Sequence, residues 1–235
     1  MKRLTALILA MVMVLALPAC GSQSAAPAEN APQATSVPTA APVEEAQRDE
    51  PAEEADVNAD ESKILIVYFS PANTDSVDAV SGATPRVGEL SSVEHLAQII
   101  GGQIDAEPVK IVPTEAYPID YNDTANQAKS EQDQDARPAF QLDVNPEKYD
   151  VIFIGYPVWW YHLPMIMQSF FDTYDLSGKT IIPFNTHAGS RDGGTYREIA
   201  ALEPDATVLD GLAVAGERAS GAEKDVLNWL AGLGY

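Results

Sequence analysis

Continuous apolar runs recur between residues 63 and 235, and stretches with helical periodicity separate them. Continuous runs rich in β-branched and aromatic residues predict strands buried on both faces at 63–69 and 151–155 and, more weakly, at 180–184. A less apolar strand is expected at 103–111, and the last strand at 206–214. Apolar residues three and four apart predict helices at 92–100, 164–174 and 222–233, and a polar surface helix is expected at 122–135. Strands that alternate with helices predict right-handed βαβ units and a parallel sheet between helical layers. The expected fold is therefore α/β, a three-layer sandwich with a five-stranded parallel sheet of order 2-1-3-4-5.

The chain begins with a different pattern. Lys2 and Arg3 precede the apolar run Leu4–Leu17, which ends at Leu17-Pro18-Ala19-Cys20-Gly21. A positive start and a run of this length are typical of a signal peptide, whereas a membrane-spanning helix needs about 20 apolar residues. We expect residues 1–19 to be a signal peptide.

Cys20 is the only cysteine of the chain. The residues around it resemble a bacterial lipobox, and that resemblance implies that Cys20 is acylated and becomes the mature N-terminus. A leftover thiol behind an ordinary secretory signal is the alternative. Acylation would attach the protein to a membrane surface outside the cytoplasm by its lipid anchor only.

Residues 20–62 are rich in Ala, Pro, Ser and Glu and contain no aromatic residue. Such a composition cannot bury enough apolar surface to offset the entropy of ordering, so we expect a disordered tether. Residues 63–235 then form one folded domain with room for a core.

The formal net charge is −21. This charge speaks against binding to nucleic acid or to an anionic lipid surface. It favours solubility, and it leaves cationic partners or a generally acidic surface as alternative interpretations.

Unusual residues follow three of the predicted strands. The segments are Ser70-Pro71-Ala72-Asn73-Thr74, Tyr156-Pro157-Val158-Trp159-Trp160-Tyr161 and Asn185-Thr186-His187-Ala188-Gly189-Ser190. Ligands of open parallel sheets bind at the carboxyl ends of the strands, near the switch in strand order. The sequence therefore predicts a ligand site where these segments meet.

The run from Val151 to Ser190 closely resembles the flavodoxin-like domains of bacterial lipoproteins with a YP-x-WW sequence, and a looser likeness covers 63–235. The resemblance implies a flavodoxin-like fold that binds FMN. It implies flavin contacts from the loop after the third strand (Tyr156, Pro157, Val158, Trp159 and Trp160) and from the loop after the fourth (Asn185, Thr186, His187, Gly189 and Ser190).

The chemistry of these loops suits a flavin ring. A flat ring needs an aromatic or apolar wall and a few polar groups at its edge. We expect one of Trp159 and Trp160 to lie in the core and the other to face the flavin. His187 either donates a hydrogen bond that favours reduced flavin or caps its own loop.

The segment expected to bind the FMN phosphate departs from the family pattern, in which a short Ser/Thr-rich loop runs straight from the first strand into the first helix. Here about twenty residues separate Ser70 from the helix expected to start near Ser91 and Ser92. Serine hydroxyls at a helix N-terminus suit a phosphate group. We expect Ser91 and Ser92 to bind the FMN phosphate, with Ser70 beside them.

The inserted segment contains Asp78-Ala79-Val80-Ser81-Gly82-Ala83-Thr84. It resembles the D-x-x-S-G-A-T motif of subunits to which a flavin transferase links FMN through a threonine phosphoester. That resemblance implies covalent FMN on Thr84; an ordinary Ser/Gly/Ala turn with dissociable FMN is the alternative.

The expected function is that of an FMN-dependent electron carrier or small oxidoreductase. Its partners would be redox proteins or small electron acceptors. An NAD(P)H-dependent quinone or flavin reductase is one alternative, although the chain contains no G-x-G-x-x-G motif. A lipoprotein that binds a ligand or partner without redox chemistry is another.

Overall fold

The structure, a computed structural model, describes residues 63–71, 87–88 and 90–235. The expected signal peptide, the tether, Cys20 and Thr84 lie outside these residues. Among the helices of the described part, none is long and apolar enough to cross a lipid bilayer.

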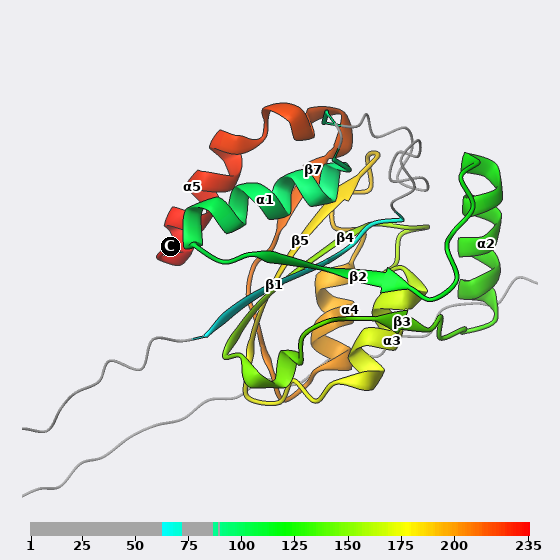
Figure 1. Ribbon diagram of the computed structural model, residues 1–235, viewed down its shortest axis with the longest axis horizontal. Coiled ribbons are helices and arrows are strands. Elements are labelled where there is room, and N and C mark those ends of the chain that lie inside the picture. Colours follow the sequence, from blue (N-terminus) through cyan, green and yellow to red (C-terminus); the bar gives the residue numbers. More distant parts are fainter. Residues whose placement is uncertain (1–62, 72–86, 89) are drawn as a thin grey trace, which may run out of the picture. The chain divides into compact units, whose positions relative to one another are not determined.

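A mostly parallel sheet forms the centre of the domain (Figure 1). Its strands follow the order β3-β2-β1-β4-β5-β6, and β7 also pairs with β5. Their bounds are β1 Ile64–Phe69, β2 Pro108–Pro113, β3 Phe140–Gln141, β4 Val151–Pro157, β5 Thr180–His187, β6 Thr207–Val208 and β7 Leu212–Ala215. The short β3 is antiparallel to β2, whereas the other paired strands are parallel. This confirms the predicted α/β fold and the order 2-1-3-4-5 of its main strands.

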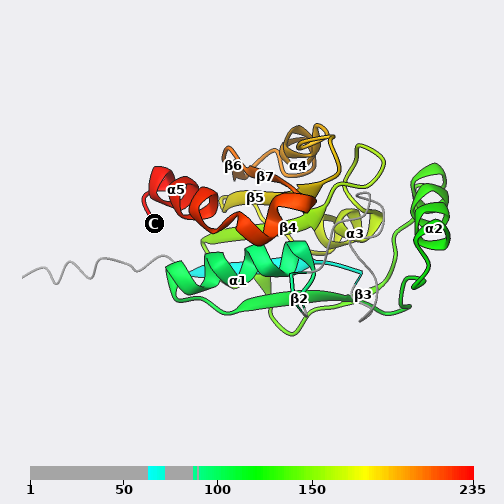
Figure 2. The same cartoon turned by 90° about the horizontal axis from the view of Figure 1, so that it is seen from above.

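Helices cover both faces of the sheet, and Figures 1 and 2 show α1 and α5 on one face and α3 and α4 on the other. Both views place α2 beyond the carboxyl ends of the strands. The bounds are α1 Ser92–Ile104, α2 Tyr121–Asp133, α3 Met165–Thr173, α4 Thr195–Leu202 and α5 Glu223–Leu233, with short 3-10 turns η2 Pro146–Lys148 and η3 Gly216–Gly221.

Each face of the sheet has its own core because side chains alternate along a strand. In β1, Leu65, Val67 and Phe69 pack with α3, whereas Ile66 and Tyr68 pack on the side of α1 and α5. Every residue of β4 is buried. The continuous apolar runs in the sequence reflect this burial on both faces.

The second strand begins later than predicted. Residues 103–104 of the predicted strand 103–111 are the last residues of α1, and the strand itself spans Pro108–Pro113. Gly101 stays helical because the returning chain packs directly on it: a Cβ there would lie 2.5 Å from the carbonyl oxygen of Ala106. Only glycine fits at position 101, and the helix continues past it to Ile104.

The predicted last strand, 206–214, is divided into β6 and β7, both of which pair with β5. The interruption faces Pro183 of β5, which has no N–H to donate to a neighbouring strand. Gly211 passes so close that a Cβ there would lie 2.5 Å from the Pro183 carbonyl oxygen. Helix α4 and strand β3 were not predicted at all.

Glu203, at the end of α4, is a buried carboxyl group whose pKa is raised to about 7, chiefly by burial and then by the charge of Asp175. A folded-state pKa above the ordinary value of 4.5 means that the folded protein retains a proton that the unfolded chain loses. Stability should therefore fall as the pH rises from about 4.5 to about 7.

Glu203→Gln should remove this loss and raise the unfolding free energy at pH 8 by about 2 kcal/mol, with a smaller gain at pH 5. Urea unfolding at both values measures the difference. Glu217→Gln, which changes an exposed carboxylate, is the matched control. An equal effect of Glu203→Gln at the two pH values would contradict the assignment.

Candidate functional site

A cavity of about 340 Å³ opens at the carboxyl ends of β4 and β5. Its walls come from the loop after β4, the loop after β5 and the start of α2, through Tyr121, Val158, Trp160, Tyr161, Ala188, Gly189 and Ser190. Three aromatic side chains and the backbone of a small-residue loop thus surround it. This combination of an apolar wall and a few polar groups, at this volume, is typical of small-molecule sites.

The loop after β4 ends in a tight turn centred on Trp160 and Tyr161. The backbone N–H of Trp159 donates to the carbonyl of His162 at 3.0 Å, and the N–H of His162 donates back to Trp159 at 2.9 Å. Trp160 and Tyr161 have φ values of 50° and 63°. Two successive left-handed residues define a type I′ turn, which normally contains Gly or Asn. Bulky residues there cost about 1–3 kcal/mol each, and such strain is common at functional sites.

The two adjacent tryptophans have different environments. Trp159 is buried, and its ring packs edge-on against Phe69 at 5.4 Å and Tyr117 at 5.2 Å. Trp160 is 46% exposed and lines the cavity, and its Nε1 donates to the Ala125 carbonyl of α2 at 3.1 Å. Trp159 is therefore a core residue, and Trp160 is the tryptophan available to a ligand.

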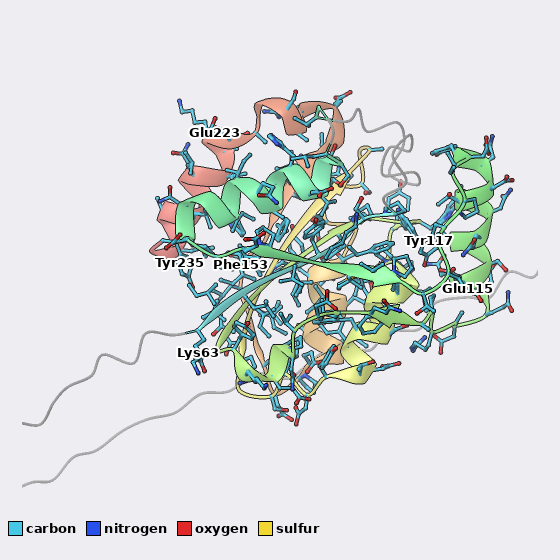
Figure 3. The ribbon with its side chains drawn as sticks, viewed as in Figure 1. Lys63, Glu115, Tyr117, Phe153, Glu223 and Tyr235 are labelled. Carbon is cyan, nitrogen blue, oxygen red and sulfur yellow. The ribbon has the colours of Figure 1, made fainter. Side chains whose placement is uncertain are left out.

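Trp159 also carries a buried polar atom, because its Nε1 has no hydrogen-bond partner within the described residues. A buried donor without a partner costs about 1–3 kcal/mol. Tyr117, which packs on the same indole, donates from its hydroxyl to Glu131 at 2.9 Å. Figure 3 shows Tyr117 on the side of the sheet that faces α2. This contact links the core beneath the turn to the helix that forms one wall of the cavity.

Buried hydrogen bonds shape the loop after β5. Tyr156 donates to the Thr195 hydroxyl at 2.8 Å, and Thr195 donates to the Asp192 carbonyl at 2.6 Å. Asn185 donates to the Arg191 carbonyl at 3.1 Å and accepts from the Tyr196 hydroxyl at 2.6 Å. These buried side chains hold residues 188–194 in place through their hydrogen bonds, and none of them lines the cavity.

The two loops contact each other directly. The N–H of Val158 donates to the Thr186 carbonyl at 2.9 Å. Gly193, at φ +61°, lies against the Val158 side chain and the Tyr161 backbone, so a Cβ there would lie 2.9 Å from Val158 Cγ1. Any side chain at 193 would push the loops apart and deform the cavity.

His187 stabilises the same loop. Its Nδ1 accepts from the Gly189 N–H at 2.9 Å, and the imidazole is buried. Burial, followed by the positive charge of Arg191, lowers the pKa of His187. The neutral imidazole thus caps its own loop through Nδ1. Donation by Nε2 to a flavin stays a prediction.

Comparison with known proteins identifies the family. Residues 63–233 match the model of a family described as flavodoxin. This chain belongs to the flavodoxin family. No curated protein sequence matches it significantly.

Two solved structures share both sequence and fold with this flavodoxin. A candidate flavoprotein from Bacteroides eggerthii is 28% identical, with a TM-score of 0.57 over 74% of this chain and 99% of the other. A second, from Bacteroides uniformis, is 26% identical, with a TM-score of 0.56, and the match covers 72% of this chain and 98% of the other. A flavoprotein from Lactobacillus acidophilus, solved in complex with FMN, is 22% identical, with a TM-score of 0.49, and the match covers 68% of this chain and 97% of the other.

The structure brings only some of the predicted site residues to the cavity. Val158, Trp160, Gly189 and Ser190 line it, whereas the others from these two loops are buried around or beneath it: Tyr156, Pro157, Trp159, Asn185, Thr186 and His187. Tyr161 and Ala188, which belong to the two predicted segments but were not among the expected flavin contacts, also line it, and so does the helix residue Tyr121, which was not predicted. No local signal in the sequence placed Tyr121 at this edge of the sheet.

The serines predicted to bind phosphate do not line this cavity. Ser91 caps α1 by accepting from the Glu94 N–H at 3.1 Å, and Ser92 is buried in the first turn of that helix. Ser70 lines a smaller cavity of about 200 Å³ that Lys110 and Tyr117 also line.

Gly193→Ala should destabilise the protein by about 1–3 kcal/mol, because the new methyl group crowds Val158 and the backbone would keep a left-handed conformation. It should also shift the NMR signal of the Trp160 indole N–H. Urea unfolding and the indole region of the spectrum measure both effects. The control is Gly221→Ala, where a Cβ meets nothing within 4 Å. A Gly193 variant indistinguishable from that control would contradict the close packing of the loops.

Proposed function

We propose that this flavodoxin binds FMN with the isoalloxazine ring in the aromatic cavity and transfers electrons there. The observation that carries the proposal is the cavity itself, which lies at the carboxyl edge of the sheet and is walled by Tyr121, Trp160 and Tyr161. Aromatic side chains interact with a flat ring by stacking or edge-to-face contact. Backbone groups and the Ser190 hydroxyl would bind the polar edge of the ring.

FMN would supply the redox chemistry, and the chain would orient the ring and control access to it. The Trp160 indole already donates to α2, and because this hydrogen bond restricts its orientation, less entropy would be lost when a ring stacks on it. Tyr161 is 69% exposed, which supports electron transfer because an external partner can approach the rim of the cavity. The neutral His187 keeps the loop after β5 closed on itself through Gly189.

We further propose that the FMN phosphate binds at the N-terminus of α1, where Ser91 and Ser92 lie, with Ser70 nearby. Helix N-termini favour anions because their N–H groups and the helix dipole point outward. Thr84 belongs to the segment between β1 and this helix, and a phosphoester with its hydroxyl would hold FMN covalently. A covalent bond has a physical rationale for a protein tethered outside the cytoplasm by an acylated Cys20, where a lost flavin is not readily replaced.

Trp160→Ala should weaken FMN binding by about tenfold, because it removes the stacking surface and the bond to α2. Trp160→Phe should weaken FMN binding less, because an aromatic ring remains at this position. Fluorescence titration with FMN measures the dissociation constants. The control is Trp229→Ala, which truncates an indole that packs on Phe153, outside the residues that line the cavity. If all three variants bind FMN as the parent does, the ring does not occupy this cavity.

Mass spectrometry of the exported protein tests both expected modifications. Protein co-expressed with a flavin transferase should carry a lipid on Cys20 and one FMN minus water on the peptide that contains Thr84. Cys20→Ser should release the protein from membranes, and Thr84→Ala should remove the flavin mass and leave dissociable FMN. An unmodified Thr84 peptide despite an active transferase would reject the covalent link alone. Unchanged membrane fractionation of Cys20→Ser would reject the anchor.

A further inference from the structure

The arginines of the described part fall into two groups. Arg137 pairs with Asp135 and Asp172, and Arg218 pairs with Asp225. Arg191 and Arg197 are exposed and, within residues 63–71, 87–88 and 90–235, neither has a carboxylate at salt-bridge distance. Both belong to the segment that leads from the cavity into α4.

The carboxylates closest in sequence to these arginines have other partners. Asp192 accepts from the Gly194 N–H at 3.1 Å. Glu198 accepts from the Leu163 N–H at 3.1 Å and from the Gln168 amide at 2.6 Å. The acidic groups thus stabilise the loops, and the guanidinium groups of Arg191 and Arg197 stay available.

Arg191 lies within the loop after β5, and Arg197 lies just beyond it in α4. Arg191 directly follows Ser190, which lines the cavity, and its charge reaches the buried His187, whose pKa it helps to lower. The side chain of Arg197 turns back toward the loop, because its Nη2 lies 3.5 Å from the position of a Cβ on Gly194. Positive charge therefore lies in and beside the loop that forms one wall of the proposed flavin site.

Folding stability does not account for these positions. Arg197 is in the first turn of α4, where the helix dipole disfavours a cation. Arg191 has φ 57°, a left-handed conformation that is strained for a residue with a side chain. In a chain of net charge −21, unpaired arginines beside the cavity would offset the general repulsion of anions.

We propose that Arg191 and Arg197 bind the phosphate or other anionic group of a small redox molecule while it exchanges electrons with the flavin. The proposal rests on the proposed function, and it names the charge class of the co-substrate. Guanidinium groups suit this role because they present several N–H donors in a planar fork that matches phosphate and carboxylate oxygens.

Stopped-flow oxidation of the photoreduced, FMN-loaded protein tests the proposal. Each reduced flavin passes two electrons to two ferricyanide ions, which become ferrocyanide, and its protons go to the solvent. At low ionic strength, Arg191→Gln/Arg197→Gln should slow this reaction about tenfold, and added salt should shrink the difference. The rate with the cation hexaammineruthenium(III) should not fall.

The matched control is Lys63→Gln/Lys148→Gln, which removes the same charge at the amino ends of β1 and β4; Figure 3 labels Lys63 there. An equal slowing by both double variants would mean that only net charge matters, and it would overturn the proposal.

Calorimetric titration with inorganic pyrophosphate gives a second readout that needs no electron transfer. The parent should bind it at least tenfold more tightly than Arg191→Gln/Arg197→Gln, and equal affinities would overturn the proposal. If the parent takes up no FMN, the proposed function fails. The same titration on the FMN-free chain then still decides whether the arginines bind anions.

Discussion

The loops after β4 and β5 are packed directly on each other, and the site depends on that contact. Strands β4 and β5 pair in register to their ends, from Val151 with Thr180 to Pro157 with Thr186. The pairing continues into the loops through the hydrogen bond from Val158 to Thr186 and the contact of Gly193 with Val158. Because these backbones have no spare space between them, the cavity walls keep a defined separation.

This rigidity allows the structure to hold a strained turn at the cavity. Trp160 and Tyr161 keep left-handed conformations because the Trp159–His162 hydrogen bonds, the buried Trp159 and the bond from Trp160 to Ala125 all act on one short segment. Glu198 adds a further constraint by accepting from the Leu163 N–H just beyond the turn. The strain presents two aromatic side chains at the cavity, an arrangement that a relaxed loop would not maintain.

The sequence predicted most of the fold because burial on both faces leaves a clear signal. The runs at β1 and β4 are almost wholly apolar, β5 contains the shorter run Ile181–Phe184, and the helices that cover them have apolar stripes. Errors arose where tertiary contacts decide local structure. Gly101 remains helical under the returning chain, Pro183 interrupts pairing along β5, and α4 begins after a Gly193-Gly194 pair that itself reads as a turn.

The site could be predicted only in part for similar reasons. The loop segments were recognisable because they follow apolar strands and contain unusual aromatic and small residues. Which residues of each segment line the cavity could not be predicted. A local pattern does not show that Tyr156 and Asn185 form buried hydrogen bonds with Thr195 and Tyr196 instead. Tyr121 reaches the cavity from a helix about forty residues away in sequence, and only the three-dimensional structure brings it there.

Flavin binding by this protein can be read from the visible absorption spectrum of the pure protein. The protein, supplied with FMN and freed of excess, should show the flavin bands in a ratio of one flavin per chain. Acid precipitation should leave the flavin with the pellet if it is covalent and release it if it is dissociable. A colourless protein that takes up no FMN on titration would show that the cavity does not hold a flavin.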